Sequence, residues 1–177
     1  MDEPRTAADL MQFLCACTWF SPHIPDFARI IQPLRNLLES LLKQSKDRSK
    51  NSARRVLISS DLWDDSVSSA FTDMLTALNH SVALSHPKAG MERCEFHDAS
   101  GDFCSIIITQ VSPEELSKPV ADQRHEPLAF YSKPFSGPAA RWSVPEKEAY
   151  GLIEAVDRFD YLLLFDQPFR ILPITGI

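Results

Sequence analysis

The fold is decided by the stretch Cys94-Glu95-Phe96-His97-Asp98, by the turn Ala99-Ser100-Gly101-Asp102 that follows it, and by the apolar run 103–110. Cys94, Phe96 and Asp98 stand at every second position, which is the period of a β-strand. The small and polar residues around the glycine supply the chemistry of a tight turn. The three pieces together predict a β-hairpin whose first strand ends at Asp98.

The C-terminal half adds strands and one helix to this hairpin. Residues 111–126 are polar and contain proline, so we expect a loop, followed by a third strand at 128–132 and a candidate fourth strand at 169–172. Ser143-Val144-Pro145-Glu146 matches a capping box with proline in the first turn, and predicts a helix that runs to about Phe159. The buried stripe expected on that helix consists of Ala149, Leu152, Ile153, Val156 and Phe159.

The N-terminal part has apolar residues at helical spacing. Residues 7–42 predict two helices, separated at Ser21-Pro22-His23-Ile24-Pro25 because proline lacks an amide hydrogen and restricts the residue before it. Asp26 is a candidate N-cap for the second helix. Residues 61–80 predict a further amphipathic helix, with Asp61 or Asp64 as its cap.

A basic segment separates these helices. It is typical of a solvated linker, and the alternative is a loop that contacts phosphates. The change of composition here predicts three parts: a helical segment at 1–55, a helical lead-in at 56–86, and a sheet-containing domain at 87–177. The basic residues are Lys43, Lys46, Arg48, Lys50, Arg54 and Arg55.

Charge and composition limit the possible functions. A net charge of −6 argues against a surface built throughout for nucleic acid, so any such binding must be local. The four cysteines form no paired C-x-x-C set, and the N-terminus lacks a secretory signal, which together favour a reduced, intracellular setting. No apolar run is long enough to cross a membrane. We expect neither a membrane partner nor a small-molecule cofactor.

Two acids could form a metal site. Asp98 ends a strand and Glu148 lies in the first turns of a helix, so they could meet if that helix packs across the sheet. Converging carboxylates are what two-metal phosphodiester cleavage requires. Other roles are open: Asp98 suits a turn that bonds its own backbone, and Glu148, like Glu146, suits the positive end of a helix.

The order of the motifs resembles one family. The chain is similar to the ribonuclease H-like domain of long-terminal-repeat retrotransposon polyproteins, in particular the gypsy type, preceded by the helical segment that follows the polymerase core. The likeness covers nearly the whole chain and implies an α/β (α+β) fold, in which a helical N-terminal segment precedes an incomplete ribonuclease H-like mixed sheet. It is carried by residues 13–20 and 23–28, Gln32-Pro33-Leu34, Trp63 with Ala70-Phe71 and Leu75, 98–110, 128–133, 146–149 and 159–162.

The resemblance assigns roles to single residues. It implies that Asp98 and Glu148 are catalytic ligands of Mg²⁺ or Mn²⁺, and that Glu146 only begins the helix. His97 stands where the family usually has threonine, and we expect a strand-end side chain there. The family continues after its next strand into Thr-Asp-His, whose aspartate is a third ligand, whereas this chain reads Pro173-Ile174-Thr175-Gly176-Ile177.

Two functions of different class follow. The first is a metal-dependent enzyme that hydrolyses the RNA strand of an RNA/DNA hybrid, working with the remainder of a Pol polyprotein. The second is a catalytically inactive retroelement remnant that at most binds nucleic acid or another protein, and the absence of the third aspartate favours it. Polymerase activity is not expected, because the Tyr-x-Asp-Asp motif of the polymerase palm is absent.

Overall fold

The computed structural model describes the whole chain except residues 1, 44–48, 100, 165–167 and 173–177. The chain divides into two compact units, which are described separately. One unit comprises residues 1–21 and 28–81, and the other comprises residues 22–27 and 82–177. The expected boundaries at residues 55 and 86 stay a prediction.

The first unit is helical, and apolar stripes hold it together. Its helices are α1 (Ala7–Trp19), α2 (Phe27–Lys43, whose first residue belongs to the second unit), α3 (Lys50–Ala53) and α4 (Asp65–Asn79). Asp64 caps α4 by accepting the amide hydrogen of Val67 at 2.9 Å, which confirms one of its two predicted caps. The buried residues include Leu10, Phe13, Leu14 and Cys17 of α1, Ile31, Leu34 and Leu41 of α2, and Val67, Ala70, Phe71 and Met74 of α4.

The predicted break after the first helix is confirmed. A short 3-10 helix, η1 (Ser21–His23), follows α1, and Asp26 then adopts a left-handed φ of 53° immediately before α2 begins. The carboxylate of Asp26 accepts a hydrogen bond from the hydroxyl of Ser105 in the hairpin. Asp26 is therefore bonded to β2 within the second unit, a role that local spacing could not indicate.

The second unit is built on a four-stranded mixed sheet. Its strands are β1 (Glu92–Asp98), β2 (Phe103–Val111), β3 (Glu126–Pro134) and β4 (Arg170–Leu172), in the order β3-β2-β1-β4. β1, β2 and β3 are antiparallel neighbours, and β4 runs parallel to β1. The predicted α/β class and the hairpin that ends at Asp98 are confirmed. Short 3-10 helices lie in the connections: η2 (Pro113–Ser117), η3 (Val120–Asp122) and η4 (Gly137–Arg141).

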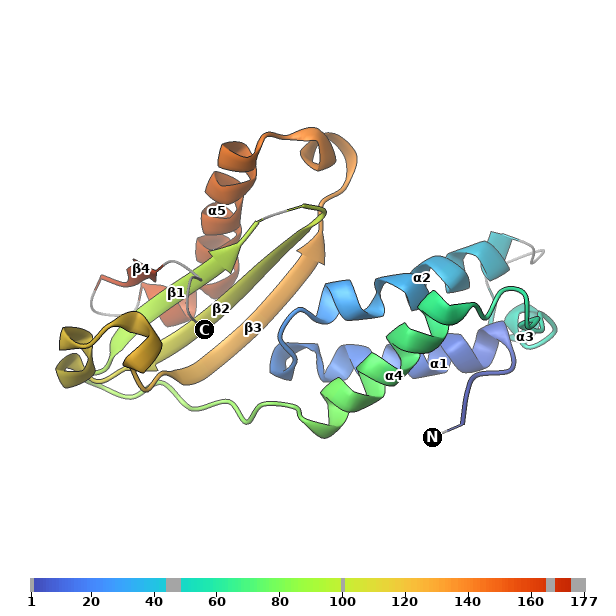
Figure 1. Ribbon diagram of the computed structural model, residues 1–177, viewed down its shortest axis with the longest axis horizontal. Coiled ribbons are helices and arrows are strands. Elements are labelled where there is room, and N and C mark those ends of the chain that lie inside the picture. The colour runs from blue at the N-terminus through green and yellow to red at the C-terminus, as the bar shows by residue number, and fades with distance from the viewer. Residues whose placement is uncertain (1, 44–48, 100, 165–167, 173–177) are drawn as a thin grey trace. The chain divides into compact units, whose positions relative to one another are not determined.

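One long helix, α5 (Val144–Leu163), packs against β1 and β2 on one side of the sheet (Figure 1). The apolar cluster beneath it includes Ile106 and Ile108 of β2. On strand parity the other face of β1 carries Phe96, which packs in a separate cluster with Ile107 and Val120. The sheet is therefore buried on both sides here, which explains the continuous apolar run of residues 106–108 in β2.

The buried stripe predicted for α5 was wrong. Ala149 and Ile153 are exposed, Leu152 and Val156 are only half-buried, and Phe159 alone is buried as expected. Small side chains at Gly151 and Ala155 let the helix backbone approach the sheet closely, so the face turned inward is the one that carries them. The residues buried on α5 are Lys147, Gly151, Ala155, Phe159, Leu162 and Leu163.

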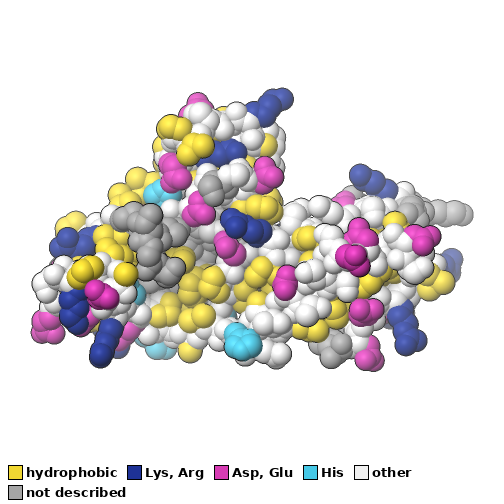
Figure 2. Space-filling model, in the orientation of Figure 1, with side chains coloured by type: hydrophobic (Ala, Val, Ile, Leu, Met, Phe, Trp, Pro, Cys, Tyr) yellow, Lys and Arg dark blue, Asp and Glu magenta, His cyan; other side chains and the backbone are white. Residues whose placement is uncertain are grey.

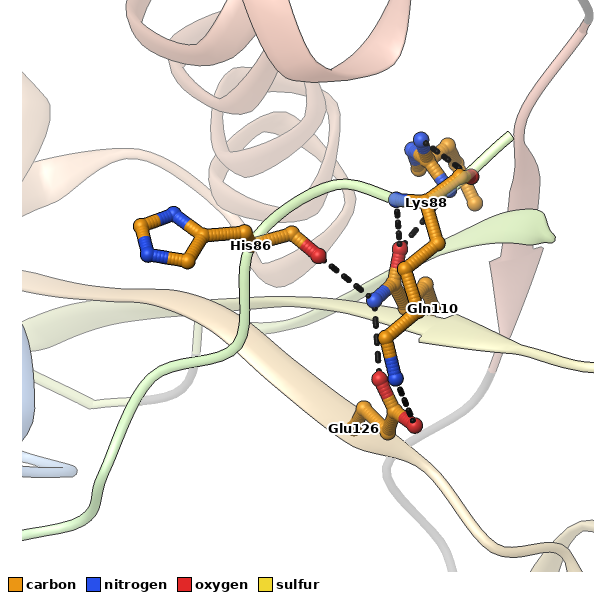
Figure 3. Close-up of polar contacts among 5 residues, drawn as sticks. His86, Lys88, Gln110 and Glu126 are labelled. Carbon is orange, nitrogen blue, oxygen red and sulfur yellow. Dashed lines mark hydrogen bonds and ion pairs between the residues drawn. The ribbon is translucent and has the colours of Figure 1, made fainter.

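A buried amide fixes the segment that leads into β1. The side chain of Gln110 in β2 is fully buried and accepts the amide hydrogen of Lys88 at 2.9 Å (Figure 3). It donates to the carbonyl oxygen of His86 at 2.9 Å and to the carboxylate of Glu126 at 2.8 Å. Because buried polar groups are costly when unpaired, these bonds define one path for residues 86–88 across the sheet.

The cysteines give a simple test of the packing. Burial raises the pKa of Cys17 and of Cys94 to about 11, and that of Cys104 to about 12, whereas Cys15 is exposed. At pH 8 the three buried thiols stay protonated and inaccessible, and the thiolate is the reactive form. We expect a thiol reagent at pH 8 to modify one cysteine of the native protein and all four after denaturation. A second thiol that reacts as fast as Cys15 would contradict this packing.

The surface carries mixed charge. On the face shown in Figure 2, basic and acidic side chains are interspersed rather than gathered in separate patches. Within the described part of the chain, no helix is long and apolar enough to cross a membrane. The mixed charge on this face agrees with the expectation that any nucleic-acid contact is local.

Candidate metal centre and nucleic-acid contacts

Asp98 lies where the sequence placed it, as the last residue of β1. It is half-buried, and it pairs across the ladder with Ser105 of β2. The turn after it contains Gly101, whose φ of 60° is a conformation that favours glycine. The strand end therefore presents the Asp98 carboxyl from a fixed backbone.

The start of α5 places Glu148. Ser143 donates to the carboxylate of Glu146 through its amide at 2.8 Å and through its hydroxyl at 2.7 Å, which completes the predicted capping box. These bonds lower the pKa of Glu146, with the hydroxyl of Ser143 as the largest cause. Glu146 is thus confirmed as the acid that begins the helix. Glu148 projects from the following turn, and 43% of its side chain is exposed.

The side chain that Glu148 meets is His97. Nε2 of His97 lies 3.2 Å from Oε2 of Glu148, and Nδ1 of the same ring lies 2.9 and 3.1 Å from the carboxylate oxygens of Glu95. Glu95 is fully buried in the middle of β1. Hydrogen bonding to Glu95 is the largest cause of a raised pKa for His97, and the charges of Glu95 and Glu148 add to it while burial opposes it.

His97 and Asp98 are neighbours in a strand, so their side chains leave opposite faces of the sheet. Glu148 thus reaches the end of β1 on the face of His97, one residue from Asp98. The predicted approach of α5 to the end of β1 is confirmed, while a shared site of Asp98 and Glu148 stays a prediction.

Two residues that the sequence did not single out hold this corner together. Lys147 is buried, and its ammonium donates to the carbonyl oxygen of Gly101 at 2.6 Å and lies 4.9 Å from the ring centre of Phe135. Gly151 faces His97: a Cβ on Gly151 would lie 2.9 Å from Cδ2 of the ring. A glycine inside a helical pattern is a known sign of close approach. The sequence gave no comparable sign for Lys147.

The donors at this corner fit a divalent ion in type. Carboxylate oxygens are what Mg²⁺ prefers, and it commonly uses one or two of them together with water. Their number falls short of a two-ion site: within the described residues, no group of three or more His, Cys, Asp or Glu side chains is placed to hold a metal ion. The end of β1 thus offers Asp98 on one face of the sheet and Glu148, already bonded to His97, on the other.

The basic segment is only partly described. Lys43 ends α2, and Arg54 and Arg55 follow α3, all three with exposed side chains. Lys50 begins α3, but its side chain lies outside the description, as do residues Lys46 and Arg48 altogether. A contact of this segment with phosphates stays a prediction.

Comparison with known proteins identifies the family. A family model described as the RNase H-like domain found in reverse transcriptase matches residues 63–171. The chain belongs to this family. The match covers α4, β1, β2, β3, α5 and most of β4, and it therefore includes Asp98 and Glu148 of this RNase H-like domain. No curated protein matches the sequence closely enough to count as a relative.

Solved structures support the fold. The foamy viral protease-reverse transcriptase in complex with double-stranded DNA is similar with a TM-score of 0.69 and 19% identity, over 98% of this chain and 26% of that one. The same viral enzyme in complex with an RNA/DNA hybrid gives 0.69 and 19%, over 97% of this chain and 20% of that one. Our chain thus spans about a quarter or less of these proteins, and at such identity the likeness concerns the fold alone.

Proposed function

We propose that this RNase H-like domain hydrolyses the RNA strand of an RNA/DNA hybrid, as part of a gypsy-type retroelement polyprotein. The observation that carries the proposal is the crossing of α5 over the sheet, which brings the carboxylate of Glu148 to the end of β1, one residue from Asp98. The membership of the reverse transcriptase family supports the choice of substrate.

Asp98 and Glu148 would hold the divalent ion, Mg²⁺ or Mn²⁺. Such an ion, when bound, supplies charge for the developing negative oxygens and lowers the pKa of attacking water. The protein's own contribution is to present the two carboxyls from rigid elements. Lys147 holds the turn after Asp98, and the Ser143–Glu146 capping box fixes the helix that carries Glu148.

The substrate is inferred from charge and from the similar structures. The foamy viral structures were solved with double-stranded DNA and with an RNA/DNA hybrid. With a net charge of −6, this chain can attract a duplex only where basic side chains gather, and Lys43, Arg54 and Arg55 are exposed on one segment. The remainder of the polyprotein is the other partner that we propose.

The test is cleavage of a labelled hybrid in the presence of Mg²⁺ or Mn²⁺. We expect Asp98→Asn and Glu148→Gln each to lower the rate at least about 100-fold, since even outer-shell partners of metal ligands change activity or affinity by about 10- to 100-fold. Glu146→Gln is the matched control, because Glu146 bonds only at the helix start, and its rate should stay within about twofold of the wild type. Equal rates for Asp98→Asn and the wild type would refute the proposed site.

A second function is favoured by one observation. Glu148 is bonded to His97, and the described residues present no group of three metal-binding side chains. These features suit a domain that binds duplexes without cutting them. Such a domain would show no cleavage with either metal, and its affinity for a duplex would fall steeply with salt.

A further inference from the structure

The His97 ring is held between two carboxylates at the proposed metal corner. Nδ1 lies 2.9 Å from the buried carboxylate of Glu95, and Nε2 lies 3.2 Å from that of Glu148. An ionised carboxylate can only accept hydrogen bonds. The ring is therefore bonded at both nitrogens, and its bond to Glu148 occupies a carboxylate oxygen that a metal ion would need.

The ring is also confined. Gly151 of α5 faces it so closely that even a Cβ at this position would meet Cδ2 at 2.9 Å and Cγ at 3.3 Å. Only 12% of the His97 side chain is exposed. Because bonds at both nitrogens and the helix backbone fix the ring, it does not swing freely away from Glu148.

We propose that His97 is a built-in hydrogen-bond partner of Glu148, whose bond to Nε2 a divalent metal must displace before Glu148 can bind the metal. This inference rests on the proposed metal site at Glu148. His97 is then a positioning residue that weakens metal binding, and Glu95 is the buried anchor that keeps it in place. The alternative, in which Nε2 is itself a metal ligand, predicts the opposite change of affinity and serves as an outcome of the test.

The variant must remove both members of the buried pair. His97→Thr alone would leave the Glu95 carboxyl buried without its hydrogen-bond partner, which is destabilising. We therefore choose the double variant Glu95→Val and His97→Thr, since both new residues suit a strand. Circular dichroism checks that it folds.

Binding of Mn²⁺ is measured by electron paramagnetic resonance of the free ion. We expect the double variant to bind Mn²⁺ roughly tenfold more tightly than the wild type, the factor that about 1.4 kcal/mol of lost competition provides. Adding Glu148→Gln to the double variant should remove this gain. A merely structural role of His97 would not make the gain depend on Glu148.

The outcomes separate this inference from the proposed function. If the double variant binds Mn²⁺ no more tightly, while Glu148→Gln weakens binding by the wild type, the inference is overturned and the metal site stands. Weaker binding by the double variant would show that His97 is a ligand. If Glu148→Gln changes nothing in either background, both the inference and the proposed site fail.

A measurement on the wild-type protein covers the case in which the variant does not fold. The ring nitrogens of His97 can be followed by ¹H–¹⁵N correlation while Mg²⁺ is added to saturation. We expect the Nε2 signal to shift as Glu148 leaves it, while the Nδ1 signal, bonded to buried Glu95, changes less. A Nε2 signal that stays unchanged at saturation would overturn the inference.

Discussion

Replacing Gly151 by valine is expected to destabilise the RNase H-like unit by about 2 to 3 kcal/mol, the upper part of the range for overpacking a core. A Cβ alone would lie 2.9 Å from Cδ2 of His97 and 3.6 Å from Cβ of Ala99. The His97 ring is bonded at both nitrogens, so it cannot yield cheaply, and the helix must shift away from β1.

The matched control is Ala149→Val, on the exposed face of the same helix. It carries the cost of a β-branched residue in a helix, about 0.5 kcal/mol or slightly more, without any clash. Hydrogen exchange of the β2 amides reports the free energy of opening for this unit alone. Equal protection in the Gly151→Val variant and the wild type would show that α5 is not held this closely over β1.

Replacing Phe96 by alanine is expected to have a larger effect, a loss of about 3 to 5 kcal/mol in the free energy of unfolding. Phe96 is fully buried in β1, and its ring meets that of His125 edge to face with centroids 5.2 Å apart. Truncation leaves a cavity between β1 and the segment that carries Val120, which packs on the same cluster. Hydrogen exchange of β2 measures the loss.

The control for Phe96→Ala is Ile153→Ala. Ile153 is also apolar and lies in the same unit, but 57% of it is exposed on α5, so truncation should change stability by no more than about 0.5 kcal/mol. Comparable losses in the two variants would mean that β1 is not the centre of this core. They would also restore the stripe on α5 that the sequence suggested.

Local signals in the sequence were enough for most elements of the fold. The turn around Gly101 and the alternation before it correctly ended the first strand at Asp98, and the capping box correctly began α5 at Val144. Asp64 was correctly paired with the start of α4. Each of these signals involves residues a few positions apart, whose bonds form in any context.

Which face of α5 is buried could not be read in the same way. Hydrophobicity predicted that the side of α5 with Ile153 is buried. In the structure the side with Gly151 and Ala155 packs on the sheet instead. Close approach of the backbones therefore outweighed the burial of larger apolar side chains. The aliphatic part of Lys147 is buried on the same side, because its ammonium donates a hydrogen bond to the carbonyl oxygen of Gly101. Such choices depend on the partner surface, which no window of sequence contains.

Only some residues of the candidate site could be predicted from the sequence. Asp98 and Glu148 stood out through their positions at element ends, whereas the role of Glu95 depends on a pairing two residues along its own strand and on burial beneath α5. A charged residue between Cys94 and Phe96 was the available signal. His97 was expected merely to end a strand, and its contact with Glu148 arises from the crossing of the helix.

The order of the strands has a consequence for synthesis on the ribosome. β1, β2 and β3 pair with their neighbours in the chain, so this meander can close as soon as Pro134 leaves the exit tunnel, with little loop entropy to overcome. The side that α5 covers, with Ile106 and Ile108, then stays bare until Leu163 has emerged. We expect a translational pause between these two points to increase chaperone binding to the nascent domain. Without such a pause, we expect less chaperone binding.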